Sequence, residues 1–262
     1  MTIQPPPFTR YLIELSYKGT RYNGWQIQKN TSNTIQQVVH EKLSVLLQEE
    51  ITVIAAGRTD GGVHARQNFV HFDTSKVIPH DFLRRINFML PNDIAVHAVF
   101  RVKEDFNARF EALSRAYEYL ISYEKNPIHS DIICYYPYEE LSIKKLNEAA
   151  KIIKSKTDFA AFSKKRTQVK TTICNILYAH WDWDDERKLL RFQVTSDRFL
   201  RGMVRGFVAT SIRFAKGKIS EKQFHRIFES KQPHHTDFSA PAQGLTLMEV
   251  KYRKGMLTPF TV

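Results

Sequence analysis

The hydrophobic and polar positions in the first part of the chain follow two periods. Residues 10–17 alternate with the two-residue period of a half-buried strand. Residues 34–48 repeat their apolar positions at helical spacing, and Thr34 with Gln37 three residues later matches a helix-capping box. Further apolar segments predict strands at 51–56, 67–73 and 94–101, and a helix at 79–89. The order is β-α-β-β-α-β, the split βαβ arrangement of ferredoxin-like domains.

The second part of the chain predicts the same order of elements, although no residue-level repeat relates the two parts. Its predicted strands are 115–122, 174–183, 188–196 and 245–253, and its predicted helices are 142–153, 199–215 and an additional one at 220–229. We therefore predict an α+β protein with two ferredoxin-like (RRM-like) βαββαβ halves and a central mixed or antiparallel sheet. The predicted domains are residues 1–106 and 107–262.

Length and charge narrow the class of protein. The chain has 262 residues, and its 39 Lys and Arg against 27 Asp and Glu give a net charge of +12. Such an excess favours a polyanionic partner, either nucleic acid or an anionic membrane surface. No apolar run approaches the ~20 residues of a spanning helix, and Met1–Phe8 has no signal-peptide pattern. Cys134 and Cys174 form no C-x-x-C motif. We expect a soluble cytoplasmic protein with no membrane partner.

Several common kinds of site are absent from the sequence. It contains no P-loop, no G-x-G-x-x-G dinucleotide motif and no zinc-deaminase pattern. The adjacent His234 and His235 lack a third ligand at metal spacing, so we interpret them as part of a polar loop. His71 alternates within a predicted strand, which favours a paired structural histidine over a catalytic base. We expect no metal and no cofactor.

One loop combines charge with glycine. Residues 57–64, GRTDGGVH, separate two strand-like apolar runs and carry Asp60 before Gly61 and Gly62. Asp-Gly is commonly a plain turn. Glycines also let a loop present a side chain at close range, and a carboxylate there can act as a nucleophile or a base without a cofactor. A nearby guanidinium would keep Asp60 ionised, and Arg58 is one candidate.

A stripe of arginines accompanies the helix predicted at 199–215. Its members are Arg198, Arg201, Arg205 and Arg213. Because they recur at helical spacing beside Gly202 and Gly206, the stripe is a candidate for contact with phosphates. The alternatives are a solvated face for the arginines and plain helix packing for the glycines.

Two tyrosines share one face of the strand predicted at 115–122. Tyr117 and Tyr119 are two residues apart, and side chains repeat on a strand every second residue. Such tyrosines usually lie in the core, but an exposed one can stack on an unstacked base of RNA.

Six segments together resemble the tRNA pseudouridine synthase A family. They are YKGTRYNGWQIQ (17–28), GRTDGGVHA (57–65), LPNDIAV (90–96), DFNARFEALSRAYEYLI (105–121), FLRGMVRGFVA (199–209) and APAQGLTL (240–247). They occur in the family's order and extend over most of the chain. The chain departs from the family's usual pattern at Gly61, where Ala is common, and at Gly202, Gly206 and Ala209.

The resemblance implies a pseudouridine synthase fold with a positively charged cleft between the halves. It also implies a homodimer that converts uridine to pseudouridine at positions 38, 39 and 40 of the tRNA anticodon arm, without a cofactor. Asp60 matches the catalytic aspartate. The other matched residues are Arg58, which helps to flip the nucleotide, Tyr117, which packs on the base, Arg205, which pairs with the aspartate, and Leu245, which contacts the uracil. Contacts of Arg198, Arg201 and Arg213 with the RNA backbone are a further expectation.

Three other interpretations are considered. A non-catalytic RNA-binding protein with two RRM-like halves would be expected to carry K/R-G-F/Y-type aromatic boxes, and the sequence has none. A pseudouridine synthase acting on another RNA is excluded only by the resemblance. A structural oligomer would not need so large an excess of positive charge.

Overall fold

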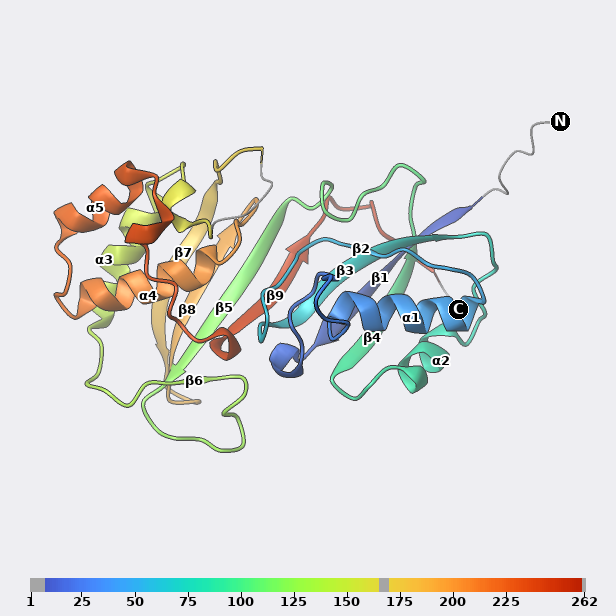
Figure 1. Cartoon of the computed structure of the whole chain (residues 1–262), viewed down its shortest axis with the longest axis horizontal. Helices are drawn as coiled ribbons and strands as arrows, with labels where there is room; N and C mark the ends of the chain where they lie inside the picture. Colours follow the sequence, from blue (N-terminus) through green and yellow to red (C-terminus); the bar gives the residue numbers. More distant parts are fainter. Residues whose placement is uncertain (1–7, 165–169, 261–262) are drawn as a thin grey trace. The chain divides into compact units, whose positions relative to one another are not determined.

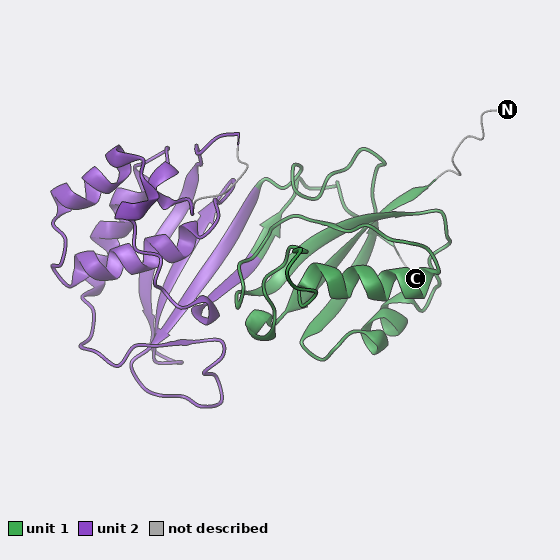
Figure 2. Cartoon of the chain, in the orientation of Figure 1, with its two compact units in different colours: residues 1–113, 249–262 green, residues 114–248 purple. Residues whose placement is uncertain are grey.

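The computed structural model describes residues 8–164 and 170–260, so residues 1–7 of the N-terminal stretch discussed above lie outside it. The chain forms two compact units (Figure 2). Unit 1 consists of Met1–Leu113 and Glu249–Val262, and unit 2 of Ser114–Met248.

Unit 1 has the predicted order β-α-β-β-α-β (Figure 1). Its elements are β1 (Thr9–Tyr17), the short 3-10 turn η1 (Gly19–Arg21), α1 (Ile35–Leu47), β2 (Ile54–Ala55), β3 (His64–Thr74), α2 (Phe82–Met89), β4 (Ile94–Arg101) and β10 (Thr258–Pro259). The strands lie in the order β10-β4-β1-β3, with β2 on β3, and all these pairs are antiparallel. Helix α1 begins as predicted, since the Thr34 side chain accepts a hydrogen bond from the Gln37 amide.

Strand β2 is shorter than the predicted 51–56. Ile54 and Ala55 pair with His71 and Val70, but the backbone of Gly57 bonds to the side chain of Asn68 instead. The ladder therefore ends where the loop that carries Asp60 begins.

Unit 2 has the elements of the second predicted half. They are β5 (Ser114–Ser122), β6 (Cys134–Tyr135), α3 (Ile143–Lys154), η2 (Ala160–Phe162), β7 (Ile176–Asp184), β8 (Leu189–Ser196), α4 (Met203–Ala215), α5 (Glu221–Ser230), η3 (Pro233–His235), η4 (Ala242–Gly244) and the first part of β9 (Leu245–Lys251), which continues into unit 1 at Glu249. The strand order is β9-β5-β8-β7, and β6 lies parallel to β5. Tyr119 on β5 and Trp181 on β7 both lie opposite Phe192 on β8, and all three are fully buried.

The boundary between the units differs from the predicted 106/107. Unit 1 continues to Leu113 and also includes the end of the chain from Glu249 onward. Two hydrogen bonds explain this: the Tyr252 hydroxyl donates 2.7 Å to the Ala108 carbonyl, and the Leu113 amide donates 2.7 Å to the Lys251 carbonyl.

Helix α4 begins later than predicted. Gly202 is its N-cap and has a φ of +74°, which only glycine adopts without strain, so the helix starts at Met203 rather than at 199. Gly202 is therefore outside the helix. Arg198 and Arg201 precede it, and they do not continue the helical stripe of Arg205 and Arg213.

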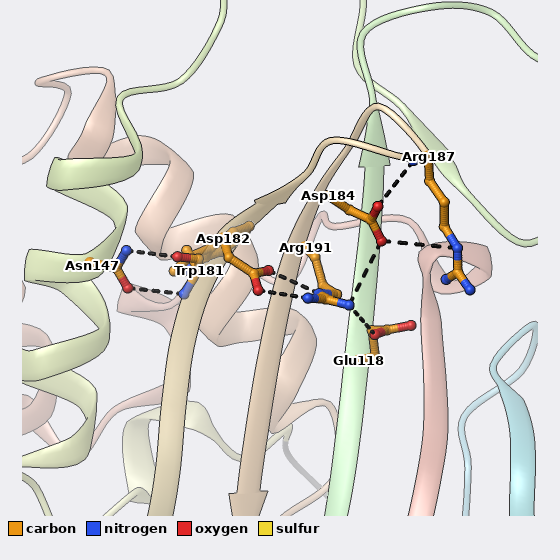
Figure 3. A network of polar contacts seen from close by, with 7 residues as sticks. All are labelled: Glu118, Asn147, Trp181, Asp182, Asp184, Arg187 and Arg191. Atoms are coloured by element: carbon orange, nitrogen blue, oxygen red, sulfur yellow. Dashed lines mark hydrogen bonds and ion pairs between the residues drawn. The ribbon is translucent and has the colours of Figure 1, made fainter.

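An ionic cluster crosses three strands of unit 2 (Figure 3). The Arg191 guanidinium on β8 donates to both oxygens of Asp182 on β7, at 2.9 and 2.7 Å. It also lies 3.8 Å from Asp184 and 4.0 Å from Glu118 on β5. Burial raises the pKa of Glu118 above its ordinary value. Cross-strand pairs of this kind favour one register, because a one-residue slip would move every side chain to the opposite face.

His71 is a paired structural histidine, as predicted. The ring is 3% exposed, and its Nδ1 accepts a hydrogen bond of 3.2 Å from the Ala108 amide. Burial is the largest cause, and with the positive charge of Arg10 it lowers the pKa of His71 from 6.5 to about 4. His71 is therefore neutral in the folded protein near neutral pH.

This neutrality predicts that the protein loses stability in mild acid. The unfolded chain takes up a proton on His71 near pH 6.5, whereas the folded chain does so only near pH 4. The free energy of unfolding therefore keeps the whole contribution of the neutral His71 above pH 6.5. It should fall by up to about 3 kcal/mol as the pH falls through that window. In His71→Asn the amide oxygen can still accept from Ala108, so urea titrations from pH 7 to 4 should show a flatter profile. Replacement of the exposed His80 by Asn serves as control, and an equal flattening there would contradict the assignment.

Candidate functional site

Asp60 lies in unit 1 on the loop between β2 and β3. Its side chain is partly exposed, Arg58 is exposed, and Thr59 between them is buried. The buried threonine anchors the loop, because its hydroxyl lies 2.9 Å from the Tyr17 hydroxyl. Burial raises the pKa of Tyr17 to about 12, so this phenol stays protonated. The loop thus holds a carboxylate at the surface while its own centre is fixed in the core.

A distant segment forms a cradle for the Asp60 loop. The Trp25 amide donates 3.0 Å to the Thr59 carbonyl, and the Gly62 amide donates 3.2 Å to the Tyr22 carbonyl. The backbones approach so closely that a Cβ on Gly24 would lie 2.7 Å from the Thr59 oxygen. The glycines of the 17–28 motif are therefore required by close backbone approach rather than by a ligand of their own.

Strand β3 holds both ends of the loop. The fully buried Asn68 clamps Gly57, since its Nδ2 donates 3.0 Å to the Gly57 carbonyl and its Oδ1 accepts from the Gly57 amide at 3.3 Å. At the other end, Nδ1 of the buried His64 accepts a hydrogen bond of 3.0 Å from the Gly19 amide. With both ends tied, the position of Asp60 is set by backbone geometry, as a pre-organised catalytic group requires.

The two glycines after Asp60 have different roles. Gly62 has a φ of +80°, whereas Gly61 has no such φ, and a Cβ there would meet its nearest neighbour, Asn23, at an ordinary 3.5 Å. We therefore expect Gly61→Ala to keep full activity and to raise the free energy of unfolding by about 0.4–1 kcal/mol, because alanine has less freedom in the unfolded chain. Gly62→Ala should instead be destabilising. Thermal unfolding of both variants measures this, and the reverse order would contradict the loop geometry.

Tyr117 is placed by β5 in unit 2. It is 8% exposed, and its ring makes an edge-to-face contact with Phe199 at 5.0 Å. Tyr119 on the same strand is fully buried, and its hydroxyl donates 2.8 Å to the Pro241 carbonyl. Both tyrosines are therefore buried, Tyr119 completely and Tyr117 with a small part of its surface left exposed.

Arg205 joins helix α4 to the segment that precedes β9. Its Nε donates 2.6 Å to the Ala240 carbonyl, and a terminal nitrogen donates 3.3 Å to the Phe238 carbonyl. The guanidinium is partly buried and its plane is fixed by these bonds. Leu245, 6% exposed, opens β9 shortly after this segment.

The remaining arginines are dispersed. Arg198 is half-buried, Arg201 is exposed in the turn before α4, and Arg213 lies half-buried in the last turn of α4. Gly206, in contrast, has a packing reason, because a Cβ there would come within 3.0–3.2 Å of Thr236, Phe162 and Phe238.

The sequence interpretation missed the residues that hold Asp60. These are Tyr17, Gly19, Gly24, Trp25, His64 and Asn68. Most of them lie within the quoted motifs, but only a three-dimensional structure shows that they contact the loop.

Two other findings concern candidate chemistry. His234 and His235 lie in the 3-10 turn η3, with ring centroids 4.0 Å apart. Within residues 8–164 and 170–260, no three His, Cys, Asp or Glu side chains are grouped closely enough to hold a metal ion. In the same part of the chain, every helix is too short or too polar to cross a membrane.

Comparison with known proteins identifies the family. The sequence pattern described as tRNA pseudouridine synthase matches residues 15–111 and 149–253. The tRNA pseudouridine synthase A of Bacteroides fragilis is 41% identical over 245 residues, covering 93% of this chain and 96% of the relative. That of Azobacteroides pseudotrichonymphae is 39% identical over 244 residues (93% and 96%), and that of Porphyromonas gingivalis is 39% identical over 246 residues (93% and 97%). The chain belongs to the tRNA pseudouridine synthase family, which confirms the resemblance inferred from its motifs.

Proposed function

We propose that this protein isomerises uridine to pseudouridine at positions 38, 39 and 40 of the tRNA anticodon stem-loop, with Asp60 as the nucleophile. Membership of the family supports the reaction and the tRNA substrate. The observation that carries the assignment of Asp60 is its partly exposed carboxylate on a loop tied at Gly57, Thr59 and Gly62. A plain surface turn would need no such anchoring.

The reaction needs no external oxidant or reductant. The bond between ribose C1′ and uracil N1 breaks, the uracil turns, and a bond forms between C1′ and C5. C5 then loses its proton while N1 gains one, so atoms and electrons balance within the nucleoside. A carboxylate can promote the first step by attack on the ribose or on the base, and covalent catalysis of this kind divides one difficult step into two easier ones.

The other site residues are proposed in supporting roles. Reaching the glycosidic bond requires that the nucleotide leave its stack, at a cost of a few kcal/mol. Arg58 is proposed to assist this flipping, Tyr117 to pack on the base and Leu245 to contact the uracil. Arg205 is proposed to act with Asp60, and its bonds to the 238–240 carbonyls would fix its orientation. Arg198, Arg201 and Arg213 are proposed to contact backbone phosphates.

We further propose that each unit is a ferredoxin-like half. The strand orders β4-β1-β3-β2 in unit 1 and β9-β5-β8-β7 in unit 2 both fit the split βαβ arrangement. A homodimer in the cytoplasm is proposed on the resemblance to the family.

The test is pseudouridine mapping on an unmodified tRNA transcript, with no added metal or cofactor. Three matched transcripts, each with one of U38, U39 and U40 replaced by C, serve as controls. We expect pseudouridine at positions 38, 39 and 40 of the unmodified transcript. In each control transcript we expect the signal to be lost only at the replaced position. Tight binding without conversion would reject the enzyme, and conversion elsewhere would reject the anticodon arm as the substrate region.

A further inference from the structure

Unit 2 contains a cavity of about 330 Å³ beside the C-terminal half of α4. The buried part of its lining includes Tyr119, Cys134 and Ala209. Tyr136, Tyr138, Arg213, Lys216 and Lys218 complete the side that solvent reaches. The cavity thus has an apolar inner surface and a basic, aromatic entrance, and none of the roles proposed above uses it as a pocket.

Positive charge dominates the entrance. Arg213, Lys216 and Lys218 face a single lining carboxylate, Asp237, whose Oδ1 accepts a hydrogen bond of 2.8 Å from the Ser239 amide. The excess of cations favours an anionic ligand. The overall charge of +12 favours nucleic acid as a polyanionic partner, and a phosphate of a nucleic acid is an anionic group of this kind.

Two tyrosine rings stand next to these cations. Nζ of Lys216 lies 4.9 Å from the Tyr138 ring centroid and 5.6 Å from that of Tyr136. The rings are in edge-to-face contact at 4.9 Å, and Tyr138 is 63% exposed. An exposed aromatic face beside a positive charge is the combination with which proteins hold single-stranded nucleotides, by stacking on the base and attracting the phosphate.

The Tyr136 hydroxyl is not part of the surface that a ligand in the cavity could contact. In the described parts of the chain it is buried and has no hydrogen-bond partner. Buried polar atoms in proteins are nearly always paired. The Tyr136 hydroxyl is an exception to this, and Tyr136 contributes its ring rather than its hydroxyl to the cavity lining.

Helix α4 relates the cavity to Arg205. Arg213 follows Arg205 by about two helical turns, a rise of about 12 Å, and Ala209 between them lines the cavity. Ala240, whose carbonyl accepts from Arg205, also lines it. A ligand in the cavity would therefore lie a few nucleotides' length from a base held near Arg205.

We propose that this cavity binds a nucleotide of the RNA substrate that flanks the target uridine, with its phosphate on Arg213, Lys216 and Lys218 and its base on Tyr138. The proposal rests on the proposed function, because that function brings the RNA to Arg205. It assigns to the cavity a part in substrate binding rather than in the chemistry.

The test combines pocket variants with backbone-modified RNA. Tyr138→Ala and Lys216→Ala are each expected to weaken binding of an anticodon stem-loop transcript about tenfold. Lys216→Ala should also make the slope of log binding constant against log salt concentration less steep, by about the amount that one phosphate contact contributes. Lys222→Ala, an exposed lysine on α5, is the matched control for charge and should bind like the wild type. One neutral methylphosphonate placed a few nucleotides from the target should weaken wild-type binding but not that of Lys216→Ala.

The outcomes separate the two proposals. Wild-type protein that binds the stem-loop but forms no pseudouridine would overturn the proposed function. Weaker binding of the stem-loop by Lys216→Ala would, in that case, still support RNA in the cavity. Equal binding by Tyr138→Ala, Lys216→Ala and Lys222→Ala would overturn the cavity proposal and leave the function standing. Lys216-dependent binding of free UMP, with no effect on the stem-loop, would overturn the RNA assignment. Tyr138→Phe, which keeps the ring, should bind like the wild type and guards against loss of folding.

Discussion

Replacement of Asp60 by Asn is expected to reduce pseudouridine formation by at least about a thousandfold, because an amide is neither a nucleophile nor a base. Affinity for tRNA should stay within a few-fold of the wild type, or rise slightly, since a negative charge near phosphates is removed. The loop should keep its place, because the bonds that hold it use the Asp60 backbone and its neighbours Thr59 and Gly62. Single-turnover conversion of a saturating tRNA transcript measures the effect, with binding measured on the same RNA.

Asp81→Asn provides the comparison. This carboxylate precedes α2 in unit 1 and pairs with the exposed Arg85 at 2.9 Å, so the same change of charge occurs away from the loop. It should leave the rate of conversion unchanged. A rate for Asp60→Asn within tenfold of that of Asp81→Asn would remove Asp60 from the chemistry.

Local patterns predicted the elements well where the sequence carries strong periodicity. The cap at Thr34 and the order β-α-β-β-α-β of unit 1 follow from such patterns. The start of α4 does not follow from such a pattern. Residues 199–202, FLRG, are compatible with a helix, but the positive φ of Gly202 separates them from it. Backbone angles of this kind depend on tertiary contacts that a single sequence does not display.

The sequence names the residues of the candidate site, whose roles stay predictions, but it does not predict the contacts that hold the Asp60 loop. The resemblance singled out Asp60 from the residues around it. Contacts of this kind, here and elsewhere in the fold, are hydrogen bonds between residues that are separated in the sequence. Asn68 bonds to Gly57, and Tyr252 bonds to Ala108. Such pairings follow from the fold as a whole, so periodicity and composition do not predict them.

Gly24→Ala is expected to disable the site although it replaces no residue with a proposed catalytic role. The new Cβ would lie 2.7 Å from the Thr59 oxygen, 3.0 Å from the Gly61 nitrogen and 3.1 Å from the Asp60 carbonyl carbon. All three are backbone atoms, so the loop itself must shift. Gly24 also has a φ of +96°, which adds strain for any other residue. We expect the free energy of unfolding to fall by about 2–4 kcal/mol.

The loss of activity should exceed what instability explains. A displacement of a catalytic group by about 1 Å can cost about a hundredfold in rate, so conversion should fall by about that factor even well below the unfolding temperature. Gly61→Ala adds the same methyl group on the other side of this contact, where the nearest atom is 3.5 Å away, and it should remain fully active. Single-turnover rates of both variants, taken where circular dichroism shows each to be folded, measure the difference. If Gly24→Ala were folded and as fast as Gly61→Ala, close contact between the 17–28 segment and the Asp60 loop would not be what positions the carboxylate. The predicted gap between two substitutions of one methyl group follows from backbone geometry alone, because neither residue has a side chain that could touch the RNA.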